Sequence, residues 1–538
     1  MKQVLELKQE HLDNLLARVQ PLLPDDEYVQ IKGIFDTLAY LTQLLENGKT
    51  TIQRLRRVLF GATTEKLRNV FKKDGNAATP PEKDDAAGAQ ETAVNKGHGR
   101  HGAQAYSGAD RVVVNHPSLL PHVCCPECQK GKLYETTRPG MLVRVVGQAP
   151  LGATVYELQK LRCNLCGEVF TAQAPEGVGS QKYDEGAASM VALLKYGSGF
   201  PFHRLEQLQG NMGLPLPAST QWHIIEKLQR VGTPAFSELV RKGAQSGTFY
   251  NDDTSMRVVE LMGRRAPNET PQEIGEPGPD RTGVFTTGIV CTTQEGHSIA
   301  LYFTGRKHAG ENLADLLAHR AKDLSAPIQM CDALSRNLPR EFKTIVANCI
   351  AHGRRKFVDV VNNFPEECHH VLEILGEVYR NDAHCRDERL SPEDRLAFHQ
   401  THSGPLMKAL EDWFTEQFET RRVEPNSGLG QAISYMRNHW SKLTLFLRQA
   451  GAPLDTNIVE RALKKAILHR KGSLFYRTQH GAHVGDLFMS LIHTCQLCGA
   501  NAYDYLTELQ KHFTELSSHP EQWMPWNYRQ TLQALGPS

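Results

Sequence analysis

Three acidic side chains that lie far apart in this chain of 538 residues are its first candidates for chemistry. Asp252 follows the strand-like run 248–250, and Asp332 directly follows a second strand-like run, 327–331. Glu460 lies much later, on a predicted helix rich in cations. Ligands and metals collect at strand ends in an α/β sheet, so the two aspartates could meet there and the later helix could fold back over them.

Converging carboxylates repel one another unless divalent cations neutralise them. Two hard cations about 4 Å apart activate a water or a 3′-hydroxyl and stabilise the leaving oxygen of a phosphodiester. Asp252, Asp332 and Glu460 therefore predict a two-metal site for a polyanionic substrate. Asp253 competes with Asp252 for the first position, because side chains alternate between the faces of a strand and only one of the two can point into the site.

The surroundings of Glu460 favour a polyanion. Asn457, Glu460 and Lys464 are spaced by three and four residues, so they share one helix face. More cations lie close by: Arg461, Lys465, Arg470 and Lys471. A solvated helix with ordinary salt bridges would show the same charges, so the two upstream acids carry the argument.

A second group of polar residues precedes the predicted helical block. Arg354 and Arg355 are either phosphate clamps or ordinary surface cations. Cys349 and His352 have a spacing that could hold a metal, but only two ligands are visible. A structural role, or a hydrogen bond from His352 to a phosphate, fits them better than zinc.

The elements that must position these residues alternate between strands and helices. A strand pattern at 248–250 leads into 251–259, further strand patterns cover 283–290, 298–303, 327–331 and 344–348, and a helix fits 312–324. Three strands, a helix and two more strands predict a mixed α/β core. Residues 357–450 read as helical throughout, so Glu460 follows a large helical insertion.

Four cysteines have the spacing of a structural zinc site, in two C-x-x-C pairs that predict a zinc ribbon: Cys125, Cys128, Cys163 and Cys166. Four thiolates leave no open position for a substrate, which argues against a zinc hydrolase. Cys124 could compete with Cys125, whereas Cys495 and Cys498 fall in a helical pattern and are interpreted as core residues.

The N-terminal third contains three further patterns. Residues 28–60 carry apolar heptads that favour a coiled coil with a partner helix over an amphipathic helix packed on its own domain. Residues 72–104 have almost nothing to bury and read as a disordered linker. Residues 184–232 predict a helical cluster, either a helix-turn-helix or a plain connector, with Ser219 and Thr220 as a possible helix cap.

The composition of the chain restricts its function less than the motifs do. Lys and Arg number 61 against 60 Asp and Glu, so net charge gives no sign of nucleic acid and any basic surface must be local. No apolar run approaches the roughly 20 residues of a membrane span, and the N-terminus lacks the apolar core of a secretory signal. We therefore expect a cytoplasmic protein of bacterial type without membrane contact, whose scattered cysteines are reduced thiols.

Several motifs resemble those of the insertion-sequence-66 family of transposases, which belongs to the Asp-Asp-Glu class. The resemblance covers nearly the whole chain, with mild departures at Ala333, Ile350 and Gly472. The motifs that carry it are Leu59-Phe60-Gly61 with Thr64-Glu65-Lys66-Leu67, the cysteine pairs, Asp252-Asp253-Thr254, Asp332, the run 349–357, Asn457 with Glu460 and Arg461, the run 470–475, and Pro525-Trp526-Asn527-Tyr528.

The resemblance implies an α/β fold with a ribonuclease-H-like mixed sheet core, a large helical insertion, an N-terminal coiled coil and a zinc ribbon. It implies Asp252, Asp332 and Glu460 as catalytic ligands of two Mg²⁺ ions, with Mn²⁺ as the alternative, beside a structural Zn²⁺. His352, Arg354, Arg355, Arg461, Lys464, Arg470 and Lys471 would contact DNA. The expected parts are 1–71 coiled coil, 72–111 linker, 112–180 zinc ribbon, 181–245 helices, 246–357 first core part, 358–453 helical insertion, 454–500 last core part and 501–538 helical tail.

The activity so implied is cleavage at terminal inverted repeats and joining of the 3′-hydroxyl ends to target DNA, in the bacterial nucleoid. The coiled coil would join protomers, and accessory proteins encoded by the same element are expected. Two alternatives stay open. One is a nuclease or resolvase on the same core, which cuts without joining, and the other is a catalytically inactive zinc-containing DNA-binding regulator.

Overall fold

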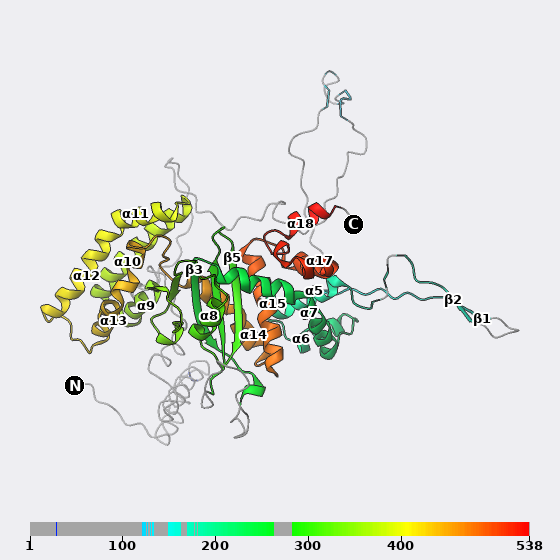
Figure 1. Ribbon diagram of the computed structural model, residues 1–538, viewed down its shortest axis with the longest axis horizontal. Helices are drawn as coiled ribbons and strands as arrows, with labels where there is room; N and C mark the ends of the chain where they lie inside the picture. Colours follow the sequence, from blue (N-terminus) through cyan, green and yellow to red (C-terminus); the bar gives the residue numbers. More distant parts are fainter. Residues whose placement is uncertain are drawn as a thin grey trace. The chain divides into compact units, whose positions relative to one another are not determined.

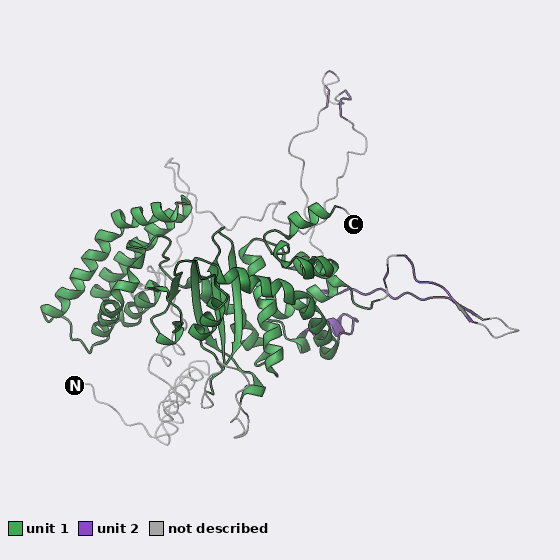
Figure 2. Cartoon of the chain, viewed as in Figure 1, with its two compact units in different colours: residues 1–74, 180–204, 217–538 green, residues 75–179, 205–216 purple. Residues whose placement is uncertain are grey.

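The computed structural model describes Tyr28 and residues 121–124, 126, 130, 132–133, 149–162, 169–176, 178–179, 181–262 and 282–536. The chain divides into two compact units. The first comprises 1–74, 180–204 and 217–538, and the second 75–179 and 205–216 (Figure 2). All predicted catalytic acids belong to the first unit.

A five-stranded mixed sheet forms the centre of the first unit. Its strands are β3 (Thr248–Ser255), β4 (Phe285–Thr292), β5 (Ser298–Gly305), β6 (Ile328–Cys331) and β7 (Ile345–Asn348), in the order β5-β4-β3-β6-β7. β3, β4 and β5 pair antiparallel, whereas β6 and β7 run parallel to β3. The predicted mixed α/β core is confirmed, with α8 (Ala309–Leu317) as the helix between the strands.

One sequence expectation about this sheet is wrong in detail. Asp252 was expected at a strand end, but β3 continues to Ser255 and places Asp252 inside the strand. The polar run 251–255 remains in the sheet because each of its residues still pairs with β4, from Asn251 opposite Ile289 to Ser255 opposite Phe285. Backbone pairing therefore overrides the weak strand preference of Asn and Asp.

Helix α15 (Gln479–Leu497) covers the free edge of the sheet at β5 (Figure 1). Three backbone amides of this edge strand donate to α15 side chains. Ala300 N donates to Thr494 Oγ1 at 3.1 Å, Tyr302 N to Ser490 Oγ at 3.0 Å, and Thr304 N to Asp486 Oδ2 at 2.7 Å. An unpaired strand edge exposes hydrogen-bonding groups that favour aggregation, and here a helix satisfies them.

The two faces of β4 are covered by different helices. Gly288 faces α14 (Asn457–Ser473), since a Cβ on this glycine would lie 3.0 Å from Leu463 and 3.4 Å from Val459. Thr287, the next residue and therefore on the opposite face, accepts a hydrogen bond from Asn312 of α8 at 2.8 Å. The close approach of α14 to the sheet depends on the missing side chain at Gly288.

A block of helices separates β7 from α14 in the sequence, as predicted. It follows α9 (Ile350–Val360) and consists of α10 (Pro365–Asp387), α11 (Pro392–His402), α12 (Gly404–Glu419), α13 (Gly428–Leu443) and the short η6 (Leu445–Leu447). Its apolar core includes Phe357 and Phe414 and extends to Ile328 and Ile345 of the sheet. Inside it, the buried Asp382 accepts from Arg386 and Arg395, both at 2.6 Å, and lies 3.3 Å from His399.

The remaining helices include the predicted cluster at 184–232. Those of the first unit are α5 (Glu185–Ala192), the π-helix η3 (Leu193–Gly197), α7 (Ala218–Ala244), α16 (Ala502–Lys511), α17 (Phe513–Ser518) and α18 (Tyr528–Leu535), with the short η4 (Val259–Leu261), η5 (Ser335–Asn337) and η7 (Pro520–Gln522). Helix α6 (Phe202–Asn211) belongs to the second unit from Leu205 onward. The predicted cap at Ser219 or Thr220 is wrong, because α7 begins at Ala218 behind Pro217, which offers no side-chain acceptor. Within the described residues, no helix combines the length and apolarity that a bilayer crossing requires.

The second unit contains a short antiparallel hairpin of β1 (Lys160–Arg162) and β2 (Val169–Thr171). These two strands flank the second predicted cysteine pair in the sequence. The zinc ligands themselves (Cys125, Cys128, Cys163 and Cys166), the linker 72–111 and, beyond Tyr28, the heptad segment 28–60 lie outside the described residues and stay predictions. The cysteines at 291, 331, 349, 368, 385 and 495 are free and buried, as expected for core thiols.

Candidate active site

The sheet brings Asp252 and Asp332 side by side. β3 and β6 run parallel, with Tyr250 opposite Met330 as the last pair in register. Two residues further along both strands lie Asp252 and Asp332. Neighbouring strands are about 4.8 Å apart, and residues two apart share a face, so both carboxylates leave the sheet on the same side. Although Asp332 directly follows the end of β6, it therefore stays level with Asp252.

The loop after β6 holds the Asp332 carboxylate. Asn337 Nδ2 and Leu334 N both donate to its Oδ1, the latter at 3.1 Å. Asn337 is itself buried. A side-chain amide and a backbone amide therefore fix one carboxylate oxygen and leave the other available. Sequence reasoning missed this positioning role, because a lone Asn in a loop carries no signal before the loop is folded.

The electrostatics of Asp252 differ from those of a surface acid. Burial raises the pKa of Asp252 to about 6, and the charges of Asp332 and Asp253 add to that rise. A hydrogen bond from Asp253 N to Asp252 Oδ1 at 2.8 Å and the nearby His352 oppose it. Two neighbouring carboxylates, one of them reluctant to ionise, form a pair that a divalent cation would relieve.

Asp253 points to the other face of the sheet. Its Oδ2 lies 2.9 Å from His308 Nδ1, its Oδ1 lies 3.4 Å from Arg336, and its side chain is only 2% exposed. His308 caps α8, and Ala309 N of that helix also lies 3.4 Å from Asp253 Oδ2. Asp253 is thus committed to anchoring α8, and Asp252 is the acid that shares a face with Asp332.

Glu460 lies in the first turn of α14, beside the start of α9. Its Oε1 is 3.8 Å from His352 Nε2 and accepts from Thr456 Oγ1 at 3.2 Å. Two bonds tie the helix starts together: Ile350 N donates to Leu454 O at 3.0 Å, and Thr456 N to Cys349 Sγ at 3.3 Å.

His352 is close to acids on both elements, since it lies 3.8 Å from Glu460 and is one of the groups that lower the pKa of Asp252. Among the described residues, Cys349, His352 and Glu460 form the one group of potential metal ligands whose atoms all lie within 4.8 Å of one another. Asp252 and Asp332 are not members of that compact group, so the three predicted acids do not form a tight triad in this structure.

The predicted DNA contacts fall into two kinds. Arg461, Lys464 and Lys471 are exposed on α14 at spacings of three and seven residues, so they follow one helix face. Arg470 is used differently, because it donates to Thr254 Oγ1 at 3.2 Å and Ser255 Oγ at 2.7 Å and anchors the end of α14 to β3. Arg354 and Arg355 lie half-buried on α9.

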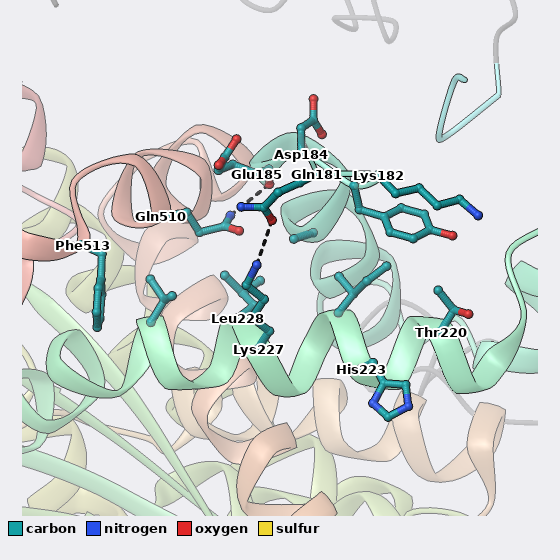
Figure 3. Close-up of a pocket in the computed structure, with 14 residues that line it drawn as sticks. Gln181, Lys182, Asp184, Glu185, Thr220, His223, Lys227, Leu228, Gln510 and Phe513 are labelled. Carbon is teal, nitrogen blue, oxygen red and sulfur yellow. Dashed lines mark hydrogen bonds between the residues drawn. The ribbon is translucent and has the colours of Figure 1, made fainter. Parts of the chain in front are cut away.

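Two cavities lie away from the acids within the first unit. One, of about 600 Å³, is lined by α7 and by segments around Gln181, Glu185 and Phe513 (Figure 3). Lys227 Nζ donates to Gln181 Oε1 across it at 2.8 Å. The other, of about 980 Å³, is lined by Lys195, Trp222, Phe475 and others near the end of α14. Neither contains a predicted catalytic residue.

Comparison with known proteins gives a consistent assignment. The profile described as "Transposase IS66 family" matches residues 181–484, more than half of the chain. Two relatives come from Sinorhizobium fredii (strain NBRC 101917 / NGR234). "Uncharacterized protein y4jD" is 32% identical over 64% of this chain and 65% of its own length, and "Uncharacterized protein y4hP" is 30% identical over 79% and 76%. The chain thus spans slightly less than two thirds of the first relative.

Proposed function

Because the chain belongs to the IS66 family of transposases, we propose that it is a DNA transposase that cuts phosphodiester bonds at the ends of its element and joins the freed 3′-hydroxyl ends to target DNA. The observation that carries the proposal is the register of β3 and β6, which sets Asp252 level with Asp332 on the face covered by α14. Glu460, in the first turn of α14, completes the set of acids.

We assign the sheet to the ribonuclease-H-like class, with the helical block as its insertion. The strand order supports this assignment, since three antiparallel strands are followed by two strands that run parallel to the first. In this arrangement the first and second acids come from neighbouring central strands and the third from a helix that lies on the same face.

The residues present fit a pair of divalent cations. Burial raises the pKa of Asp252 to about 6 beside a second acid, an arrangement that is unfavourable without a neighbouring positive charge. Asp252 and Asp332 would hold one ion and Glu460 would serve the other. The ions supply activation of the attacking oxygen and stabilisation of the leaving oxygen.

The chain's own groups would position the DNA. The exposed face of α14 with Arg461, Lys464 and Lys471 leads away from Glu460 and would follow the phosphate backbone. His352, between Asp252 and Glu460, would hydrogen-bond the phosphate that reacts, and Arg354 and Arg355 extend this cationic surface along α9. Arg470 contributes by fixing α14 to β3.

Recognition of the terminal inverted repeats is assigned to the zinc ribbon and the helices at 184–232, and self-association to the heptad segment. Two element ends must be brought together before joining, so a protein that works on them benefits from a protomer contact outside the catalytic core. On the ground of the same family membership, we also propose accessory proteins encoded by the same element as partners.

The test uses two conservative variants and two matched controls. Asp332→Asn and Glu460→Gln should abolish metal-dependent cleavage of a duplex that carries the element end and leave binding of that duplex unchanged. Asp315→Asn and Glu411→Gln alter acids of the same types that are 58% and 39% exposed, and should cleave like the unaltered protein. Normal cleavage by either active-site variant would overturn the assignment.

A strand-transfer assay separates the alternatives. Joining of a pre-cleaved end to a second DNA is expected for a transposase, whereas cutting without joining would identify a nuclease or resolvase. Full biological activity of a protein with all three acids neutralised would identify a regulator.

A further inference from the structure

Cys349, His352 and Glu460 bring together three chemically different ligands. A sulfur, an imidazole nitrogen and a carboxylate oxygen all lie within 4.8 Å of one another, and His352 Nε2 is 3.8 Å from Glu460 Oε1. Magnesium prefers oxygen ligands and disfavours thiols, whereas zinc and related ions bind thiolate and imidazole strongly. Cys349, His352 and Glu460 together therefore favour a different metal ion from the one that the two aspartates of the sheet favour.

The backbone, rather than a chance side-chain conformation, holds the three groups together. Cys349 is the N-cap of α9, and His352 lies in the first turn of that helix. Thr456 N donates to Cys349 Sγ at 3.3 Å, and Glu460 follows in the first turn of α14. The Sγ atom is thereby fixed in place at the junction of the two helix starts.

One ring nitrogen of His352 is left without a hydrogen-bond partner in this arrangement. Its Nδ1 is buried and has no hydrogen-bond partner, and its Nε2 faces Glu460. A buried ring nitrogen without a partner costs about 1–3 kcal/mol, so an ion or a partner at this ring would be favourable. Metal-binding histidines use either ring nitrogen.

We propose that Cys349, His352 and Glu460 form a site for a thiophilic divalent cation such as Zn²⁺, and that its binding withdraws Glu460 from the magnesium site and so inhibits cleavage. This inference rests on the proposed function for its inhibitory effect. Zinc–ligand bonds of about 2.0–2.3 Å place tetrahedral ligands about 3.3–3.8 Å apart. Separations of up to 4.8 Å therefore need to contract by at most about 1.5 Å.

The binding step is a simple ligand exchange. The Cys349 thiol releases its proton to solvent as a zinc–sulfur bond forms, Glu460 and His352 each donate one lone pair, and a water completes the four ligands. No electron is transferred. Cys349 has no part in the magnesium reaction, since a buried thiol is a poor ligand for that ion.

The experiment measures metal binding without DNA and inhibition with it. Co²⁺ serves as the probe, because its bond to a thiolate gives a charge-transfer absorption. The full-length protein should bind one more equivalent of Co²⁺ with this absorption than Cys349→Ser does. The comparison cancels any contribution from the predicted zinc ribbon. Cys368→Ser, which removes a buried thiol of α10, is the matched control and should bind like the unaltered protein.

Zinc inhibition provides the second readout. Magnesium-dependent cleavage by Cys349→Ser should equal that of the unaltered protein and should need at least tenfold more Zn²⁺ for half-inhibition. Equal Co²⁺ stoichiometry, or equal sensitivity to Zn²⁺, would overturn the inference. If Cys349→Ser fails to fold by circular dichroism, Cys349→Ala replaces it, and loss of the extra Co²⁺ equivalent in His352→Gln provides an independent check.

The two proposals fail in different ways. A protein that binds the extra Co²⁺ equivalent but never cleaves DNA would refute the transposase mechanism and retain the metal site. A protein that cleaves DNA with Mg²⁺ but shows no difference between the cysteine variants would retain the mechanism and refute the metal site.

Discussion

The neighbouring residues Asp252 and Asp253 offer a paired perturbation in which stability and activity should change in opposite directions. Both become asparagine, which keeps size and shape. Asp252→Asn removes an acid whose burial beside Asp332 raises its pKa to about 6. Asp253→Asn removes the charge that lies 2.9 Å from His308 and 3.4 Å from Arg336. The surroundings of Asp252 disfavour its ionised form. Those of Asp253 provide two polar partners for its carboxylate.

The sign for Asp252 follows from its two pKa values. An unfolded aspartate ionises near 3.8, whereas folded Asp252 ionises near 6. Well below pH 4, Asp252 is neutral in both the folded and the unfolded protein, so it does not change the free energy of unfolding. Stability is lost as the pH rises from about 4 to 6, and the loss is constant above 6. A shift of about 2 pKa units corresponds to about 3 kcal/mol as an upper value. Asp252→Asn should therefore raise the free energy of unfolding at pH 8 by up to that amount.

Asp253→Asn should do the reverse. Its carboxylate is buried, and loss of its charge weakens the ion pair with Arg336, the contact with His308 and the anchoring of α8. We expect it to lower the free energy of unfolding by about 1–3 kcal/mol. Cleavage should nevertheless persist at a temperature where the variant is folded, because Asp253 faces away from Asp332.

The assay combines urea denaturation between pH 4 and pH 8, without added Mg²⁺, with cleavage of the element end. We expect Asp252→Asn to have a raised free energy of unfolding and no cleavage activity. We expect Asp253→Asn to have a lowered free energy of unfolding and to retain cleavage activity. The stability difference between Asp252→Asn and the unaltered protein should vanish near pH 4. Loss of cleavage in a folded Asp253→Asn, or equal destabilisation by both variants, would refute the reasoning about the two faces of β3.

Three further predictions concern the scaffold. Gly288→Val should lower the free energy of unfolding by about 1–3 kcal/mol in urea denaturation and reduce cleavage, because its Cβ would lie 3.0 Å from Leu463 and push α14 off the sheet. Asp382→Ala should cost about 3 kcal/mol in the same measurement by leaving Arg395 unpaired in the helical block, and Asp382→Asn, which removes only the charge, should lose a similar amount; a much smaller loss in Asp382→Asn would contradict a charge-based role. Burial raises the pKa of Asp486 to about 7, so Asp486→Asn should gain stability relative to the unaltered protein by about 1.4 kcal/mol per pH unit between pH 4 and 7 and no more above 7; a pH-independent difference would exclude this.

The sequence predicted the elements of the core well because each one is specified locally. β6 is buried at every position and β4 at most of them, and such runs read as strands without knowledge of their partners. Asp332 was found because it directly follows such a run. Asp252 was harder to place, since the polar run from Asn251 to Ser255 hides the continuation of β3.

The relations between elements could not be predicted from local patterns. The level position of Asp252 and Asp332 depends on the register of two strands that meet only in the folded sheet. The role of Asp253 depends on α8, and that of Asn337 on a loop. The contact between Thr456 N and Cys349 Sγ joins residues 107 positions apart, so no periodicity could reveal that Cys349 lies beside Glu460.

The helical block separates Glu460 from Asp252 and Asp332 in the sequence. The structure shows how a block of this length fits between β7 and α14. The two ends of the block meet, because Ile350 N donates to Leu454 O at 3.0 Å just before α14 begins. Loop closure costs grow slowly with length, so a long insertion between two fixed ends is inexpensive. The block also packs on Ile328 and Ile345 and so covers the sheet on the side of β7, as α15 covers it at β5. Both flanks are thereby closed, and the acids lie on the central strands between them.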